Sequence, residues 1–183
     1  MSTNFDLVSA MNVAFGNERG NPLAIDWSRV RSQSLNVLDE FIELMSAFGL
    51  ESETMAQLKA VRKRLTADKF SPNTPDHEKV RDTLCDIHVY AYGAHHLMGI
   101  NADEDTIEVV EKVMTRFIKD DADKAATQAM HAAAGVTQVS FEGEYPTMIM
   151  RSTADQPDAP VGKFMKSASF QEPVFPAPGQ SRR

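Results

Sequence analysis

Cysteine is almost absent from this chain, since Cys85 is the only one in 183 residues. A single thiol excludes an internal disulfide, and its place inside an apolar helical pattern predicts a reduced, buried thiol, which favours the cytoplasm. Long uncharged apolar runs are also missing, because no stretch approaches the roughly 20 residues that span a bilayer. The start, MSTNFDLVSAMNVAFGNERG, lacks a basic region followed by an apolar run. We therefore expect neither export nor membrane insertion.

Positive charge is also scarce. Lys and Arg number 19 against 26 Asp and Glu, so the formal net charge is -7. Such a balance repels the phosphate backbone of a duplex, and genomic nucleic acid is not an expected partner. A free nucleotide differs, because divalent ions can bridge its phosphates to acidic side chains. The acidity therefore favours a metal site.

What the chain does have is helical periodicity. Hydrophobic residues make up 42% and charged residues 25%, which is typical of a globular protein. Apolar residues recur at helical spacing through most of the sequence, and glycines close several of these runs. The predicted helices are Asn4 to Phe15, Asp26 to Phe48, Ser52 to Leu65, Lys79 to Met98, Asp103 to Ile118 and Asp121 to Ala134.

After the last helix the pattern changes to period two over VTQVSFEGEYPTMIMRS, which predicts a small β-hairpin. From residue 154 onward Pro, Ser, Asp and Gln predominate, so we expect an extended arm with its last residues disordered. The predicted fold is all-α, with about five or six helices. Its expected divisions are a helical domain with the hairpin at 1–153 and the arm at 154–183.

Two pairs of acidic residues lie at helical spacing. Glu40 and Glu43 are three residues apart and share one helical face, with Asp39 beside them. Asp82 and Asp86 are one turn apart on a later helix that is otherwise apolar. If the two helices pack face to face, these carboxylates form an oxygen cage suited to magnesium. The alternative is that the acids only solvate exposed helical faces.

The order of several segments resembles the all-α nucleoside triphosphate pyrophosphatases, the MazG-like proteins with their phage and phosphoribosyl-ATP pyrophosphohydrolase relatives. The resemblance covers most of the chain and rests on the following segments: NVAFG, LDEFIELMSAF, RDTLCDIHVYAYGAHHLMGIN, EKVMTRFIKDDADKAATQAMHAAAGV and GKFMKSASFQEPVF. It implies a MazG-like helical bundle that works with Mg²⁺ or Mn²⁺. It also implies a homodimer or homotetramer.

The family's first acidic motif falls on Asp39, Glu40 and Glu43, to which the resemblance assigns catalysis. Glu40 and Glu43 are also predicted metal ligands. Asp39 is the weaker catalytic candidate, with a role in orienting water or in supporting the ligands.

The family's second motif has a glutamate three residues before an aspartate. Asp86 takes the aspartate place, whereas Thr83 stands where the glutamate would be. Asp82 lies one turn before Asp86 on nearly the same face, so it is predicted to serve instead. Asp82 and Asp86 complete the predicted metal ligands.

Substrate binding is implied for residues elsewhere in the chain. Arg116 matches a cationic position and offers a bidentate fork for phosphate, while Val113 replaces an asparagine that relatives often carry. The segment GKFMKS places Lys163 and Lys166 on an arm that resembles the family's, although solvated surface lysines are the alternative. A second group of candidates, Asn12 and Phe15, could line a base pocket, and Phe15 is equally reasonable as a core residue.

The resemblance implies hydrolysis of a nucleoside or deoxynucleoside triphosphate between its α- and β-phosphates, which releases a monophosphate and pyrophosphate. Phage-like features suggest control of nucleotide pools in the cytoplasm of a bacterial or phage-infected cell, and Val113 keeps a preference for dGTP open. The competing hypothesis is a non-catalytic helical interaction protein on the same fold.

Overall fold

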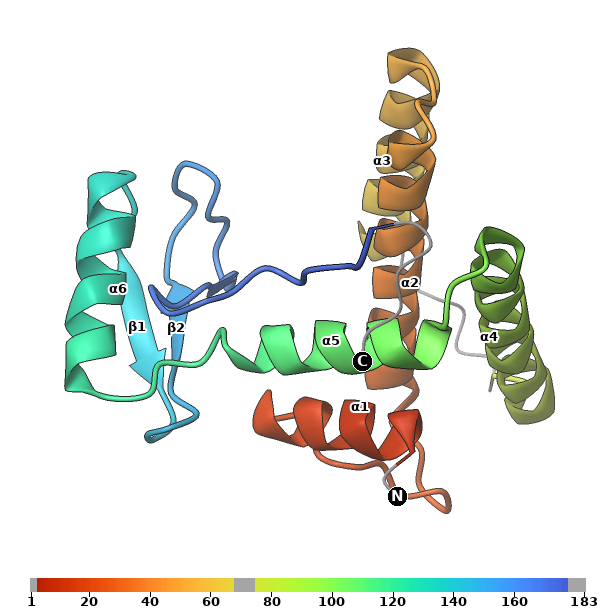
Figure 1. Cartoon of the computed structure of the whole chain (residues 1–183), viewed down its shortest axis with the longest axis horizontal. Coiled ribbons are helices and arrows are strands. Elements are labelled where there is room, and N and C mark those ends of the chain that lie inside the picture. The colour runs from red at the N-terminus through yellow and green to blue at the C-terminus, as the bar shows by residue number, and fades with distance from the viewer. Residues whose placement is uncertain (1–2, 68–74, 178–183) are drawn as a thin grey trace. The chain divides into compact units, whose positions relative to one another are not determined.

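The computed structural model describes residues 3–67 and 75–177. Within them the chain forms six helices and one three-stranded antiparallel sheet (Figure 1). The helices are α1 (Asn4–Ala14), α2 (Trp27–Ala47), α3 (Ser52–Ala67), α4 (His77–Met98), α5 (Ala102–Met114) and α6 (Asp121–Ala133), and the strands are β1 (Val139–Glu142), β2 (Ile149–Ser152) and β3 (Phe164–Met165). The mostly helical character predicted from the sequence is confirmed. The disorder predicted for the last residues falls on 178–183, outside the described residues.

Five of the six predicted helices agree with the structure to within two residues at each end. The exception is α5, which was expected to reach Ile118 and ends at Met114. The Ile118 backbone N–H donates instead to the Met148 carbonyl at 2.8 Å, and its side chain is buried. The helix α5 ends before Ile118 because this residue packs and hydrogen-bonds beside the sheet.

The chain divides into two compact units. Unit 1 comprises Met1–Arg19 together with Tyr90–Arg183, and unit 2 comprises Gly20–Val89. The boundary falls inside α4. The residues after 153, expected from the sequence to form an arm, belong to unit 1.

The small sheet of unit 1 has one strand more than the predicted hairpin. β1 pairs antiparallel with β2, with Phe141 opposite Met150, and β3 adds to the other edge of β2, with Met165 opposite Met150. The segment expected as an arm therefore contributes a strand. The buried core of the sheet region is made of Ile118, Val136, Met150, Ala159 and Met165.

Gln156 closes the loop that joins β2 to β3. The Gln156 Oε1 accepts the backbone N–H groups of Thr137 and Gln138, each at 2.8 Å. The Gln156 Nε2 donates to the Gln138 carbonyl and to the Ser152 hydroxyl, again at 2.8 Å each. Ser152 is buried, and its hydroxyl also lies within hydrogen-bond distance of the Ala154 carbonyl, at 2.7 Å, and of the Ala159 carbonyl, at 3.0 Å. The Gln156 side chain thus holds the loop against the sheet through these four hydrogen bonds.

Helices α1 and α5 lie side by side within unit 1 (Figure 1). The Asn4 side chain donates to the Asp103 carboxylate at 2.6 Å, and the Tyr92 hydroxyl donates to the same oxygen at 2.7 Å.

Farther along the chain the Tyr145 hydroxyl donates to the Asp121 carboxylate in the first turn of α6, at 2.7 Å. This hydrogen bond to a carboxylate raises the pKa of Tyr145 to about 12.

Unit 2 is built on a helical hairpin of α2 and α3. Gly49 ends the first helix in a left-handed conformation with φ of +78°, which suits glycine because it has no Cβ. Ile42 of α2 and Met55 of α3 are buried, whereas none of the residues of α4 is buried. The burial predicted for Cys85 on α4 is therefore wrong, because this residue is exposed. Among the described residues, no helix combines the length and the apolar character needed to cross a membrane.

Candidate functional site

The acidic motif of α2 lies on a well-defined helix. The Asp26 side chain caps its start by accepting the Arg29 backbone N–H at 3.1 Å, and burial of Ile42 fixes one face. Glu40 and Glu43 are exposed. Within the described residues neither makes a hydrogen bond or an ion pair. Both carboxylates are therefore available to a ligand.

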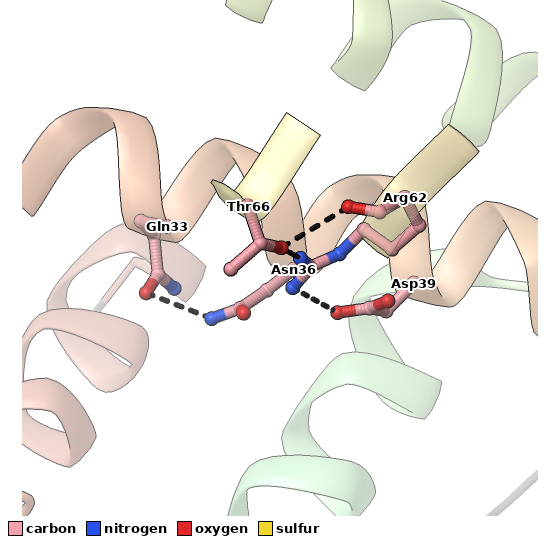
Figure 2. A network of polar contacts seen from close by, with 5 residues as sticks. All are labelled: Gln33, Asn36, Asp39, Arg62 and Thr66. Atoms are coloured by element: carbon pink, nitrogen blue, oxygen red, sulfur yellow. Dashed lines mark hydrogen bonds and ion pairs between the residues drawn. The ribbon is translucent and has the colours of Figure 1, made fainter. Parts of the chain in front are cut away.

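Asp39 differs from its neighbours because it has a partner in the protein. Its Oδ2 pairs with the Nη2 of Arg62 from α3 at 2.7 Å, and the same guanidinium contacts the Thr66 hydroxyl (Figure 2). The Asp39 side chain is 45% exposed and the Arg62 side chain 21%. The charge of Asp39 is thus committed to the packing of α2 against α3, which supports its lower rank as a catalytic candidate.

The second acidic pair lies on α4. Asp82 and Asp86 are both exposed, and neither bonds to another described side chain or backbone group. The start of α4 is held within unit 2 by its own cap, the Asp76 side chain, which accepts the Lys79 backbone N–H at 3.0 Å. An edge-to-face contact between Trp27 and His77, with ring centroids 6.0 Å apart, also involves this end of the helix. The acids follow one and two turns later.

The donor set fits a magnesium ion by chemical type. Mg²⁺ binds oxygen ligands and prefers carboxylates, and unit 2 offers four at the predicted ligand positions, Glu40, Glu43, Asp82 and Asp86, all of them exposed and bonded to no other described residue. In residues 3–67 and 75–177, however, no three His, Cys, Asp or Glu side chains are gathered closely enough to hold an ion. The assembly of these carboxylates into one cage stays a prediction.

Between α2 and α4, unit 2 has an open groove of about 240 Å³. Its lining is mainly apolar and comprises Ser34, Val37, Lys79, Val80, Thr83, Leu84 and Ile87. Thr83, which replaces the glutamate of the resembling family, therefore lines the groove. Asp82 and Asp86 are next to groove-lining residues in the sequence, but none of the four acids lines the groove.

The predicted phosphate-binding cations all lie in unit 1, and their surroundings differ. The Arg116 guanidinium lies over the Phe170 ring, 5.3 Å from its centroid, and its buried Nε has no hydrogen-bond partner among the described residues. The Lys166 ammonium lies over the same ring at 4.2 Å and pairs with Glu172 at 2.5 Å. Lys163 instead donates to the Asp158 carbonyl, at 2.5 Å. Arg116 and Lys166 therefore converge on one ring, while Lys163 is engaged with the backbone of its own loop.

The two base-pocket candidates have structural partners. The Asn12 amide donates to the Val8 carbonyl of its own helix at 2.9 Å. Phe15 packs against Phe117 and Phe164, with ring centroids 4.9 and 5.1 Å away. These contacts favour the core interpretation of Phe15 that the sequence left open, because three aromatic rings shield one another there.

Three residues beside the candidate sites were not singled out from the sequence. Arg62 of α3 is the first, and it neutralises Asp39. Phe170 and Glu172 lie in the tail segment and contact the two cations. Sequence spacing gave no signal for these contacts, because residues four and six positions along an extended chain lie about 13 and 20 Å away. A turn in which the Phe170 N–H donates to the Ser167 carbonyl at 3.2 Å belongs to the same segment.

The chain was compared with protein-family models, with curated proteins and with solved structures, and none of them matches it.

Proposed function

We propose that this chain is a metal-dependent pyrophosphohydrolase of nucleoside triphosphates on a MazG-like fold. The observation that carries the proposal is the set of four exposed carboxylates in unit 2, Glu40, Glu43, Asp82 and Asp86, none of which is used in an internal ion pair among the described residues. Some other carboxylates hold the structure together, as Asp39 does with Arg62. Acids that contribute nothing to the fold are available for function.

In this proposal the four carboxylates hold Mg²⁺ or Mn²⁺, which when bound neutralises phosphate charge and makes water more acidic. Glu40 or Glu43 orients the attacking water and takes its proton as the water oxygen bonds to the α-phosphorus. The bond between that phosphorus and its bridging oxygen breaks, and pyrophosphate leaves. Arg116 binds phosphate through its guanidinium fork.

The substrate proposed is a deoxynucleoside triphosphate in a bacterial or phage-infected cytoplasm. Val113 replaces a polar residue of the resembling family with an apolar one, so base selection differs from that of relatives with asparagine there. We include dGTP among the preferred candidates for this reason.

The test is release of pyrophosphate from a panel of ribo- and deoxyribonucleoside triphosphates, with Mg²⁺, with Mn²⁺ and with chelator. Asp86→Asn removes one charge from the proposed ligand set and keeps the side-chain volume. Loss of groups that merely support metal ligands costs about 10- to 100-fold, so loss of a ligand should lower kcat/KM by at least about 100-fold.

The matched control is Glu53→Gln on α3, which also removes one charge from an exposed helical carboxylate. It should leave kcat/KM within about twofold of the wild type, since surface changes away from a site have little effect. Absence of pyrophosphate release from every nucleotide in folded wild-type protein would contradict the proposal.

The second candidate function is a helical interaction protein, and the exposure of α4 favours it. Val89 is 65% exposed and Tyr90 is 77% exposed, on a helix with no buried residue. Apolar surface of this kind is stabilised when another chain covers it. The same surface fits the homodimer or homotetramer that the resemblance implies.

Metal dependence separates the two candidates. An ion that binds only the folded state at 100 times its Kd stabilises it by about 2.7 kcal/mol, so the hydrolase should unfold at higher urea in Mg²⁺ than in chelator. The interaction protein should show no such difference.

A further inference from the structure

Two cations and one carboxylate lie near the Phe170 ring of unit 1. Arg116 and Lys166 both lie over the ring, and Glu172 is the carboxylate that pairs with Lys166. In the described part of the chain the Arg116 guanidinium has no carboxylate partner. One ring thus holds two cations, of which only one is neutralised.

The backbone that carries Lys166 and Phe170 is firmly held. The buried Ser167 hydroxyl donates to the Thr115 carbonyl at 2.8 Å, and the Ala168 N–H donates to the hydroxyl of Thr127 at 2.8 Å. The Ser167 N–H donates to the Arg116 carbonyl at 3.2 Å, which ties the arm directly to the residue that bears the other cation. The two cations and the ring are therefore positioned by the fold.

Glu172, by contrast, is held only loosely at the same place. Its side chain is 70% exposed and that of Lys166 is 43% exposed, so water and salt screen their attraction. A ligand with a higher negative charge and several oxygens can replace such a carboxylate at modest cost, because phosphate oxygens form stronger charge-assisted hydrogen bonds with both cations. The pair at 2.5 Å is displaceable.

We propose that Glu172 is a built-in competitor that occupies Lys166 until a polyphosphate, such as the triphosphate of a nucleotide, displaces it and binds Lys166 and Arg116 at the Phe170 ring. This inference rests on the proposed function, because it names the residue that opposes substrate phosphate at its cationic positions. Glu172 lowers affinity for anions weaker than a polyphosphate and thereby selects against single phosphates and carboxylates.

The first experiment is titration of the full chain with tripolyphosphate by calorimetry, in chelator and at about 0.15 M salt, where exposed charges beyond about 8 Å are screened. Glu172→Gln keeps the side-chain size and removes the competing charge. Exposed ion pairs contribute little, so we expect tripolyphosphate to bind the variant up to about 5-fold more tightly than the wild type.

The matched control is Glu142→Gln, which breaks a similar exposed ion pair, with Arg151 at 2.9 Å on the sheet. It should leave the Kd unchanged. In a Lys166→Met background, Glu172→Gln should have no effect, because the competitor acts through that lysine. An equal effect of both glutamine variants, a Glu172→Gln effect that persists without Lys166, or no binding to any variant at millimolar ligand overturns the proposal.

Two further measurements separate this inference from the proposed function and identify the source of the phosphate. In chelator, dGTP should bind like tripolyphosphate if the phosphates alone are recognised, and more tightly if the base adds contacts. Binding of tripolyphosphate that responds to Glu172→Gln, without hydrolysis of any nucleotide in Mg²⁺, would refute the hydrolase and leave the polyphosphate site standing. Hydrolysis with no response to Glu172→Gln would do the reverse.

Discussion

Units 1 and 2 differ in how completely they satisfy their own side chains. Around the sheet of unit 1, Met150 is fully buried, Gln156 uses both ends of its amide, and serine and threonine hydroxyls fix the arm. In unit 2 the buried apolar residues are Ile42 and Met55, within the part of the unit that is described. The four carboxylates of the proposed metal site lie in this second unit, whereas the predicted phosphate-binding cations lie in unit 1. The comparison teaches that the proposed metal ligands come from the unit with the smaller buried core, and the cations from the unit whose backbone is held by more internal hydrogen bonds.

The largest expected effect on stability comes from shortening one apolar side chain in each unit, which tests this comparison. Met150→Ala leaves a cavity between β1 and β3, and truncation of a buried methionine costs about 2–5 kcal/mol in free energy of unfolding. Val89→Ala, on α4, should cost no more than about 0.5 kcal/mol because its side chain is mainly in water. Urea unfolding followed by circular dichroism measures both.

If Val89→Ala costs as much as Met150→Ala, then α4 is covered in solution by another chain. Repeating the unfolding at several protein concentrations identifies that case, because the stability of an oligomer depends on concentration. The difference between the units would then describe only the separate chain.

The helices were predictable because their signal is local. The residues that define α2 repeat at helical spacing and end at Gly49, so the prediction of Asp26 to Phe48 came within a residue of the observed bounds at each end. β3 was missed because a strand of two residues has no period to detect. Its existence depends on pairing with β2, which the intervening loop closes through Gln156.

The candidate site was predictable only in part, for the same physical reason. Helical spacing is enough to place Glu40 and Glu43 on one face. It gives no information on whether Asp39 meets Arg62, because that contact depends on how α2 packs against α3, 23 residues along the chain. The meeting of Arg116 with Lys166 over Phe170 likewise depends on the tertiary path of the arm.

An intermediate loss of stability should follow from weakening the hydrogen bonds of Gln156, which close the loop between β2 and β3 in unit 1. Gln156→Glu keeps the shape of the side chain and its accepting oxygen, but a carboxylate cannot donate to the Gln138 carbonyl or to the Ser152 hydroxyl. Each of the two lost hydrogen bonds is worth about 0.5–1.5 kcal/mol, so the free energy of unfolding should fall by about 1–3 kcal/mol, which urea unfolding should detect. Gln171→Glu, whose amide bonds only to the exposed Lys112 side chain, is the control and should change stability little. Equal stabilities of the two variants would show that the loop closure is dispensable.

The smallest expected effect concerns the acid of unit 2 that does have a partner. Asp39→Asn weakens the ion pair with Arg62, and because both side chains are partly exposed we expect a loss below about 1 kcal/mol in the free energy of unfolding. Glu40→Gln, next to it, breaks no ion pair and should leave stability unchanged. On the proposed function the two variants should rank oppositely in activity, since Glu40 is free to act on water and Asp39 is engaged.

Turnover measured on both variants therefore decides whether the ion pair in Figure 2 belongs to the working protein. A loss of kcat in Asp39→Asn as large as in Glu40→Gln would mean that Asp39 leaves Arg62 when substrate binds. Arg62→Gln distinguishes the reason, because it frees Asp39 without removing it. Activity kept in Arg62→Gln and lost in Asp39→Asn would assign Asp39 to the chemistry, whereas loss in both would show that the pair is needed to hold α2 against α3 while the reaction proceeds.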